Sequence, residues 1–223
     1  MTEFWDWNFA KNTAAQLSTV SLLTIKVTVF SYAIALILGL VFAVFKTFRV
    51  KYLSTIVVGF VEFIRLTPLL LQIFFVYYSL PLLGVSISAF SAGVIALGVH
   101  YACYCSEVYK AGITSVHGSQ LEAAKVLSLP PRVVFTRVIL PQAIPPVIPP
   151  LGNYLIALFK ETPMLSTVGL VEILYRAQLI SAATFRPVEP LTIAGIYFLI
   201  LSIIAAVIVR LCENFFSLRK FGV

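Results

Sequence analysis

The chain alternates long charge-free stretches with shorter segments that carry most of its charges. The charge-free stretches run from Val27 to Phe45, Leu66 to Ser106, Val138 to Phe159 and Pro190 to Val209. A helix that crosses a bilayer needs roughly 20 mostly apolar residues. The stretch from Leu66 to Ser106 is too long for one crossing, and Pro81 to Ser86 supplies a turn that divides it. The pattern therefore predicts five transmembrane helices, at about 17–45, 56–80, 89–109, 138–159 and 190–211.

Composition agrees with a membrane protein. Hydrophobic residues make up 60% of the chain, charged residues only 11%, and the mean hydropathy is +1.00. These values predict an all-α integral membrane protein with one transmembrane domain over residues 1–223. The first 16 residues contain Glu3, Asp6 and Lys11 and no continuous apolar core, so we expect no cleaved signal peptide. The less apolar segment from Lys160 to Glu189 is expected to re-enter the membrane or lie along its outer surface.

The positive charges predict the orientation. They gather in the first loop, in the loop after the third span and at the carboxyl end: Lys46, Arg49, Lys51; Lys110, Lys125, Arg132, Arg137; Arg210, Arg219, Lys220. Because positive residues concentrate on the cytoplasmic side, we expect the amino terminus outside and the carboxyl terminus inside. Topology then accounts for the net charge of +7, and nothing favours nucleic-acid binding.

The segment 110–137 is expected to be a cytoplasmic loop that contains a short preformed helix. Ser119 and Glu122 have the spacing of a capping box, and Ala123, Ala124 and Lys125 continue as good helix formers. A small apolar strip is expected at Leu121, Ala124 and Leu127 or Ser128. Pro130 and Pro131 should stop this helix, and a second short helix from Arg132 to Arg137 should lead into the fourth span.

Placing charged and polar side chains inside a membrane costs free energy, so those in the spans are expected to have partners or a function. Glu62 and Arg65, and likewise Glu107 and Lys110, are three residues apart and are expected to pair. The alternative for Glu62 and Arg65 is a role in a gate or subunit contact. Five prolines between Pro141 and Pro150 should free carbonyl groups and make the entry to the fourth span kinked or irregular. Beyond them, two alternatives stay open, a translocation path or a purely structural gate or interface, for Asn153, Tyr154, Lys160, Glu161 and Thr162.

The loop also resembles the EAA loop of the membrane subunits of ABC importers. That motif is Glu-Ala-Ala, three residues, Gly, nine residues, Ile, any residue, Leu-Pro, and its spacing holds from Glu122 to Pro141, with Ser128 for Gly and Val138 for Ile. A left-handed backbone at Ser128 would cost about 1 kcal/mol relative to Gly. Either the turn there differs or that strain is tolerated.

Other segments extend the resemblance to the polar amino acid permease branch. They are 63–72 (FIRLTPLLLQ, with Leu66 where Gly is commoner), 104–113, 139–143, 149–153 and 159–166 (FKETPMLS, with Pro163 where Ser is commoner). Segments 161–166 and 184–192 are also similar to ectoine and hydroxyectoine permeases, so a compatible-solute importer is the alternative.

The resemblance implies a type I ABC importer permease, multi-pass in the cytoplasmic (inner) membrane of a prokaryote. It implies a pair of permease subunits, identical or paralogous, two ATPase subunits that bind ATP and Mg, and an extracytoplasmic solute-binding protein. The ATPase-coupling residues would be Ser119, Glu122, Ala123, Ala124, Ser128 and Arg132. The gate or subunit-interface residues would be Glu62, Arg65, Thr67 and Pro68.

Other classes fit less well. The chain has no Gly-x4-Gly-Lys-Ser/Thr loop, so ATP chemistry must come from another subunit and no cofactor is expected here. His100 and His117 are isolated, and no catalytic pattern accompanies them. Cys103, Cys105 and Cys212 lack metal-ligand spacing and are expected to be small packing residues. A stand-alone channel remains possible in physical terms, but it does not explain the capped helix in the loop.

Overall fold

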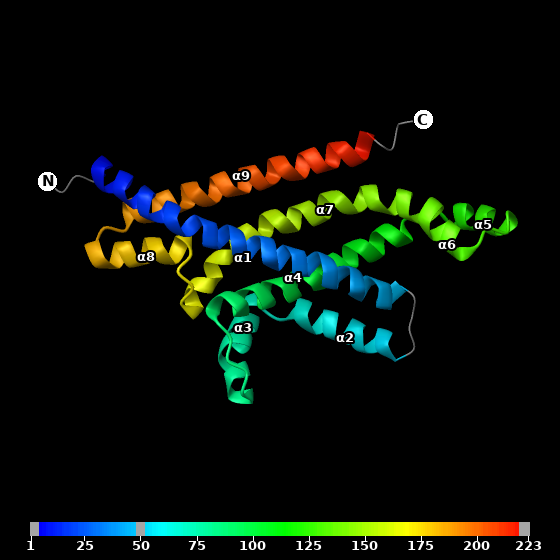
Figure 1. The fold of residues 1–223 in the computed structure, drawn as a ribbon, viewed down its shortest axis with the longest axis horizontal. Coiled ribbons are helices and arrows are strands. Elements are labelled where there is room, and N and C mark those ends of the chain that lie inside the picture. The colour runs from blue at the N-terminus through cyan, green and yellow to red at the C-terminus, as the bar shows by residue number, and fades with distance from the viewer. Residues whose placement is uncertain (1–4, 48–51, 219–223) are drawn as a thin grey trace. The chain divides into compact units, whose positions relative to one another are not determined.

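The computed structural model describes residues 5–47 and 52–218, so Arg49, Lys51, Arg219 and Lys220 lie outside the described residues. The longest helices are α1, α4, α7 and α9 (Figure 1). In chain order the elements are α1 (Trp7–Thr47), α2 (Leu53–Leu66), α3 (Leu69–Phe74), η1 (Phe75–Ser79), η2 (Leu80–Leu83), α4 (Ala89–Thr114), α5 (Gly118–Val126), α6 (Pro131–Val133), η3 (Val134–Ile139), α7 (Leu140–Glu161), η4 (Thr162–Val168), α8 (Ile173–Thr184) and α9 (Val188–Leu218).

Among the described residues, four helical stretches are long and apolar enough to cross a membrane, and an interrupted pair makes up to five. The interrupted pair is Leu53–Leu66 with Leu69–Leu83, and the break lies at Thr67 and Pro68. The sequence predicts one unbroken second span here, at about 56–80. The turn predicted near Pro81 is present, because Gly84 has a φ of 83° and ends η2. The less apolar segment after Lys160 forms η4 and α8.

The chain divides into two compact units. Unit 1 comprises residues 1–34, 67–99 and 155–205, and unit 2 comprises 35–66, 100–154 and 206–223. The helices α1, α4, α7 and α9 each contribute residues to both units.

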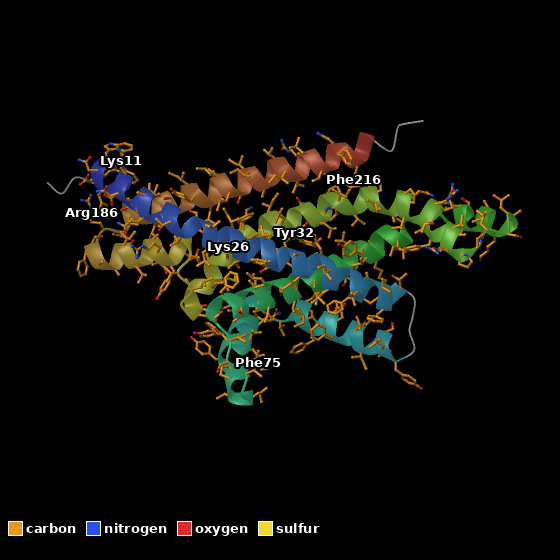
Figure 2. The ribbon with its side chains drawn as sticks, viewed as in Figure 1. Lys11, Lys26, Tyr32, Phe75, Arg186 and Phe216 are labelled. Atoms are coloured by element: carbon orange, nitrogen blue, oxygen red, sulfur yellow. The ribbon has the colours of Figure 1, made fainter. Side chains whose placement is uncertain are left out.

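The core of unit 1 forms where the first part of α1 meets α8 and α9. Leu17 and Ile173 are fully buried there. Asp6, which lies just before α1, is connected to the start of α9 by ion pairs. Arg186 pairs with both Asp6 (3.7 Å) and Glu189. Figure 2 labels Arg186 near the start of α1. The other buried members of the core are Ala10, Ala177, Ile180, Ile193 and Ala194.

Small residues allow the helices of unit 2 to approach closely. A Cβ added at Gly112 on α4 would lie 2.2 Å from a methyl of Val147 on α7. One added at Gly152 would lie equally close to Val209 on α9. Cys105 packs against Gly39 in the same way, and Cys103 is also buried, as predicted. Cys212 is exposed, so the prediction that it packs inside the chain is wrong.

Candidate functional site

The loop between α4 and α7 contains the predicted preformed helix, α5, but a different residue caps it. The helix begins at Gly118, and the N-cap is His117, whose Nδ1 accepts from the backbone amide of Ser119 at 3.4 Å. The same nitrogen lies 2.8 Å from the Ser119 hydroxyl. The predicted capping box of Ser119 and Glu122 is therefore wrong. The helix starts two residues earlier than expected, and an imidazole takes the place of the hydroxyl acceptor.

The carboxyl end of α5 has the hydrogen bonds of a Schellman motif. The amide of Leu129 donates to the carbonyl of Ala124 at 3.1 Å, and the amide of Ser128 donates to the carbonyl of Lys125 at 2.9 Å. This pattern needs a left-handed residue after the helix, and Ser128 has a φ of 51°. Of the two outcomes left open by the sequence, the strained one occurs. Ser128 keeps the conformation that glycine adopts without strain.

Burial separates the predicted coupling residues into two groups. Ala124 is 3% exposed and lies on the side of α5 that packs against η3. The other predicted coupling residues are exposed, namely Ser119, Glu122, Ala123, Ser128 and Arg132. The end of α5 also exposes Val126 (84%) and Leu127 (70%). Of the predicted apolar strip, Ala124 is buried, Leu121 is half-buried and Leu127 is exposed.

The second predicted short helix is not a separate element. The stretch from Pro131 to Val168 is continuously helical, through α6, the π-helical η3, α7 and the 3₁₀ turn η4. The prolines inside α7 do not interrupt it, although the π-helical stretch just before them is the predicted irregular entry. Movement of η3, against which α5 packs, would therefore be passed directly along α7.

A charged cluster in unit 2 joins α1, α2 and α4. Arg65 lies 3.3 Å from Glu62, as predicted, and 3.6 Å from Glu107. Glu107 also pairs with Lys46, whose side chain is almost fully buried. The predicted pair of Glu107 and Lys110 is wrong, because Glu107 instead pairs with cations on two other helices. Sequence spacing could find Glu62 with Arg65 but could not find partners far away in the chain.

Aromatic rings continue this cluster. The guanidinium of Arg65 lies over the ring of Tyr104, 5.3 Å from its centre. Tyr104, Tyr101 and Tyr154 contact one another, with ring centres 5.7–6.3 Å apart. Tyr154 of the predicted path is therefore part of the cluster, whereas its neighbour Asn153 is exposed. We missed Tyr101 and Tyr104, because aromatic residues in an apolar span carry no signal that separates packing from function.

The remaining predicted path residues belong to unit 1. Lys160 is exposed and Glu161 half-buried, whereas Thr162 is fully buried and donates its hydroxyl to the carbonyl of Phe159 at 2.9 Å.

At the helix break, the Gln72 side chain donates to the Thr67 carbonyl (3.1 Å) and hydroxyl (2.9 Å). Thr67, with Pro68 as the N-cap of α3, thus shapes the break.

A buried carboxylate in unit 1 was also missed. Glu172 is fully buried and caps α8, accepting from the amides of Leu174 (2.9 Å) and Tyr175 (2.7 Å). Burial raises the pKa of Glu172 from 4.5 to about 7, and the two amide bonds offset part of this rise. The sequence signal was a Glu just before a helical stretch, which usually marks an exposed cap.

Comparison with known proteins identifies the family. The family model of the binding-protein-dependent transport system inner membrane component matches residues 35–217. A probable amino-acid ABC transporter permease protein, y4tG of Sinorhizobium fredii, is 46% identical over 90% of this chain and 86% of its own length. The arginine transport system permease protein ArtQ of Bacillus subtilis is 38% identical, covering 86% of this chain and 88% of its own.

Solved structures agree with the predicted fold. A chain from the crystal structure of an amino acid ABC transporter with histidines is 31% identical and superposes with a TM-score of 0.88, covering 96% of this chain and 99% of that one. A chain of the MetNI methionine ABC transporter, at 18% identity and a TM-score of 0.63, shares the fold, over 92% of this chain and 98% of its own. The resemblance drawn from the EAA loop is thus confirmed. The chain belongs to the family of binding-protein-dependent transport system inner membrane components.

Proposed function

We propose that this chain is the membrane-spanning subunit of an ATP-driven ABC importer for a polar amino acid, working by alternating access. The relatives named for amino acid and arginine transport support the cargo class. The observation that carries the proposal is α5, a short helix capped at both ends that presents Glu122 and Ala123 at the spacing of the EAA loop. Such a helix can transmit a force from a partner without unfolding, because backbone groups at both of its ends are already hydrogen-bonded.

The proposed coupling segment is 110–137. An ATPase subunit would contact the exposed residues of α5 and Arg132, and the continuous helix through η3 and α7 would carry the movement into the membrane. ATP and Mg would be bound by that ATPase, not by this chain. A second permease subunit and an extracytoplasmic binding protein complete the proposed complex, in the inner membrane of a prokaryote with the amino terminus outside.

Reconstitution tests this function. The chain would be purified with its ATPase and binding protein, placed in liposomes that contain ATP, and assayed with radiolabelled L-arginine, L-glutamine and ectoine. We expect uptake of an amino acid that stops without ATP. Uptake of ectoine alone would favour the compatible-solute alternative. Passive uptake by the chain without an ATPase would instead support a channel.

The matched variants Glu122→Arg and Glu213→Arg test the coupling role. Both replace a glutamate of unit 2 with a cation, but only Glu122 lies on α5. We expect Glu122→Arg to abolish cargo-stimulated ATP hydrolysis or the retention of the ATPase, and Glu213→Arg to leave both intact. Full stimulation and full assembly in Glu122→Arg would contradict the assignment of α5.

A further inference from the structure

The prolines of α7 remove hydrogen-bond donors from a defined part of the helix. In an α-helix, the carbonyl of residue i accepts from the amide of residue i+4, and proline has no amide hydrogen. Prolines lie inside α7 at positions 145, 146, 149 and 150. The carbonyls that lose their i+4 donors are those of Pro141, Gln142, Pro145 and Pro146.

Two of these carbonyls lose a second donor as well. For Gln142 and Pro146, the residues at both i+3 and i+4 are prolines, so neither an α-type nor a 3₁₀-type bond can form. An i+5 bond would require π-helical geometry, and the structure assigns α-helix from Leu140 to Glu161. The carbonyls of Pro141 and Pro145 keep the i+3 amides of Ile144 and Ile148. The shortage within α7 is therefore concentrated at Gln142 and Pro146.

These two residues lie on the side of α7 that is not used for packing within unit 2. The buried side carries Ala143, Val147 and Leu151, at a spacing of four. Gln142 and Pro146 are exposed, as is Asn153 further along the same helix. Residues four apart share a helix face, so the two carbonyls lie about 6 Å apart along it.

A carbonyl without a donor costs several kcal/mol in hydrocarbon, so this face of α7 should meet water or hydrogen-bond donors and not lipid tails. Carbonyl oxygens only accept hydrogen bonds, and their partial charge is negative, which suits an ammonium group with three N–H donors. We propose that the carbonyls of Gln142 and Pro146 form a binding site for the ammonium group of the transported amino acid. This site rests on the proposed function and names the chemical group of the cargo that α7 recognises.

Alanine substitutions can supply the missing amides one pair at a time. The double variant Pro146→Ala/Pro150→Ala places N–H groups at i+4 from Gln142 and Pro146, which would occupy both proposed acceptors. The control Pro145→Ala/Pro149→Ala also removes two prolines, but its new amides make α-type bonds to the carbonyls of Pro141 and Pro145 and can reach those of Gln142 and Pro146 only with the poorer i+3 geometry. Both variants stiffen the helix to a similar degree, so a difference between them reports on the acceptors.

The measurement is equilibrium binding of radiolabelled L-arginine and L-glutamine to the purified permease–ATPase complex without the binding protein, alongside uptake in proteoliposomes. We expect Pro146→Ala/Pro150→Ala to weaken binding at least about a hundredfold, since two hydrogen bonds to a charged group are lost. The single variant Pro150→Ala should weaken it at least about tenfold, since one such bond is lost. The control should weaken binding no more than about tenfold, because the 3₁₀-type bonds that its new amides can make to the two acceptors have poorer geometry.

Equal binding by the two double variants, or unchanged binding by Pro146→Ala/Pro150→Ala, would overturn the site. So would loss of complex assembly in that variant alone, because the face would then be a subunit interface. A wild-type complex that takes up neither amino acid contradicts the proposed function itself. Uptake by the wild type with unaltered binding in the variant overturns only the carbonyl site.

Discussion

At the scale of single residues, the backbone angle of Ser128 determines how α5 ends. Its φ of 51° closes the Schellman motif, but it places a side chain where only glycine is unstrained. We expect Ser128→Gly to stabilise this loop by about 1 kcal/mol. The measurement is hydrogen exchange at the amides of Ser128 and Leu129, which should slow. The matched control Gln120→Gly puts glycine inside α5 and should speed exchange.

Glu172 makes stability depend on pH in an unusual direction for a carboxylate. Its pKa of about 7 in the folded protein exceeds 4.5, so the folded state holds this proton more tightly than the unfolded chain does. The free energy of unfolding should therefore fall, by about 3 kcal/mol, as the pH rises from about 4.5 to about 7, and level off above. Thermal unfolding of the detergent-purified protein across this range measures it.

The controls for this pH dependence are two glutamine variants. Glu172→Gln should remove the slope, because an amide does not titrate, while the exposed Glu122→Gln should leave it unchanged. An unaltered slope in Glu172→Gln would assign the pH dependence to another group.

At the scale of elements, Glu107 links three helices through its two cationic partners. Glu107→Gln would leave the buried Lys46 without its counter-charge, so we expect a loss of stability of about 3 kcal/mol. Thermal unfolding in detergent provides the measurement. Lys110→Ala should change little, because Lys110 does not pair with Glu107. The double variant Lys46→Met/Glu107→Gln should recover much of the loss, since both charges of the pair are gone.

The helices themselves were largely predictable from the sequence. Charge-free stretches located the spans because bilayer thickness and the absence of water inside it constrain them directly. The ends were less predictable: α1 begins at Trp7 and not near Leu17, because charges such as Lys11 are tolerated once a helix extends into water. The break at Thr67 and Pro68 was missed although the proline was visible, since local propensity does not say whether neighbours will support a kink.

The candidate site was less predictable than the fold. Local rules identified the ion pair of Glu62 with Arg65 and the question of a left-handed backbone at Ser128, because both depend only on residues close together in the sequence. They placed the cap of α5 on Ser119 and not on His117, because the spacing of Ser119 and Glu122 matches a capping box whereas histidine is not among the preferred capping residues. They could not pair Lys46 with Glu107, since that contact depends on how α1 packs against α4.

At the scale of the whole molecule, the net charge belongs entirely to one of the two units. Unit 2 holds eleven lysines and arginines against four glutamates, and unit 1 holds five cations against five acidic residues. The loop of α5 belongs to unit 2 as well. This division supports the proposed orientation, in which that loop is cytoplasmic.

Reporter fusions test the orientation. Alkaline phosphatase, which is active only outside the cytoplasm, should be inactive when fused after Lys125 and active when fused after Ala182. A fluorescent protein that matures only in the cytoplasm should give the opposite result. Phosphatase activity at Lys125 would reverse the proposed topology and remove α5 from the side where ATP is available.

The uneven charge also has a consequence for the lipids around the protein. Each lysine or arginine close to a leaflet rich in anionic lipid gains about 1 kcal/mol, and salt screens this attraction within a Debye length. The seven uncompensated positive charges of unit 2 would therefore collect a shell of anionic headgroups, whereas the balanced unit 1 would recruit none. Purification in neutral detergent removes that shell, so the lipid added back determines how much of the protein's native electrostatic environment is restored.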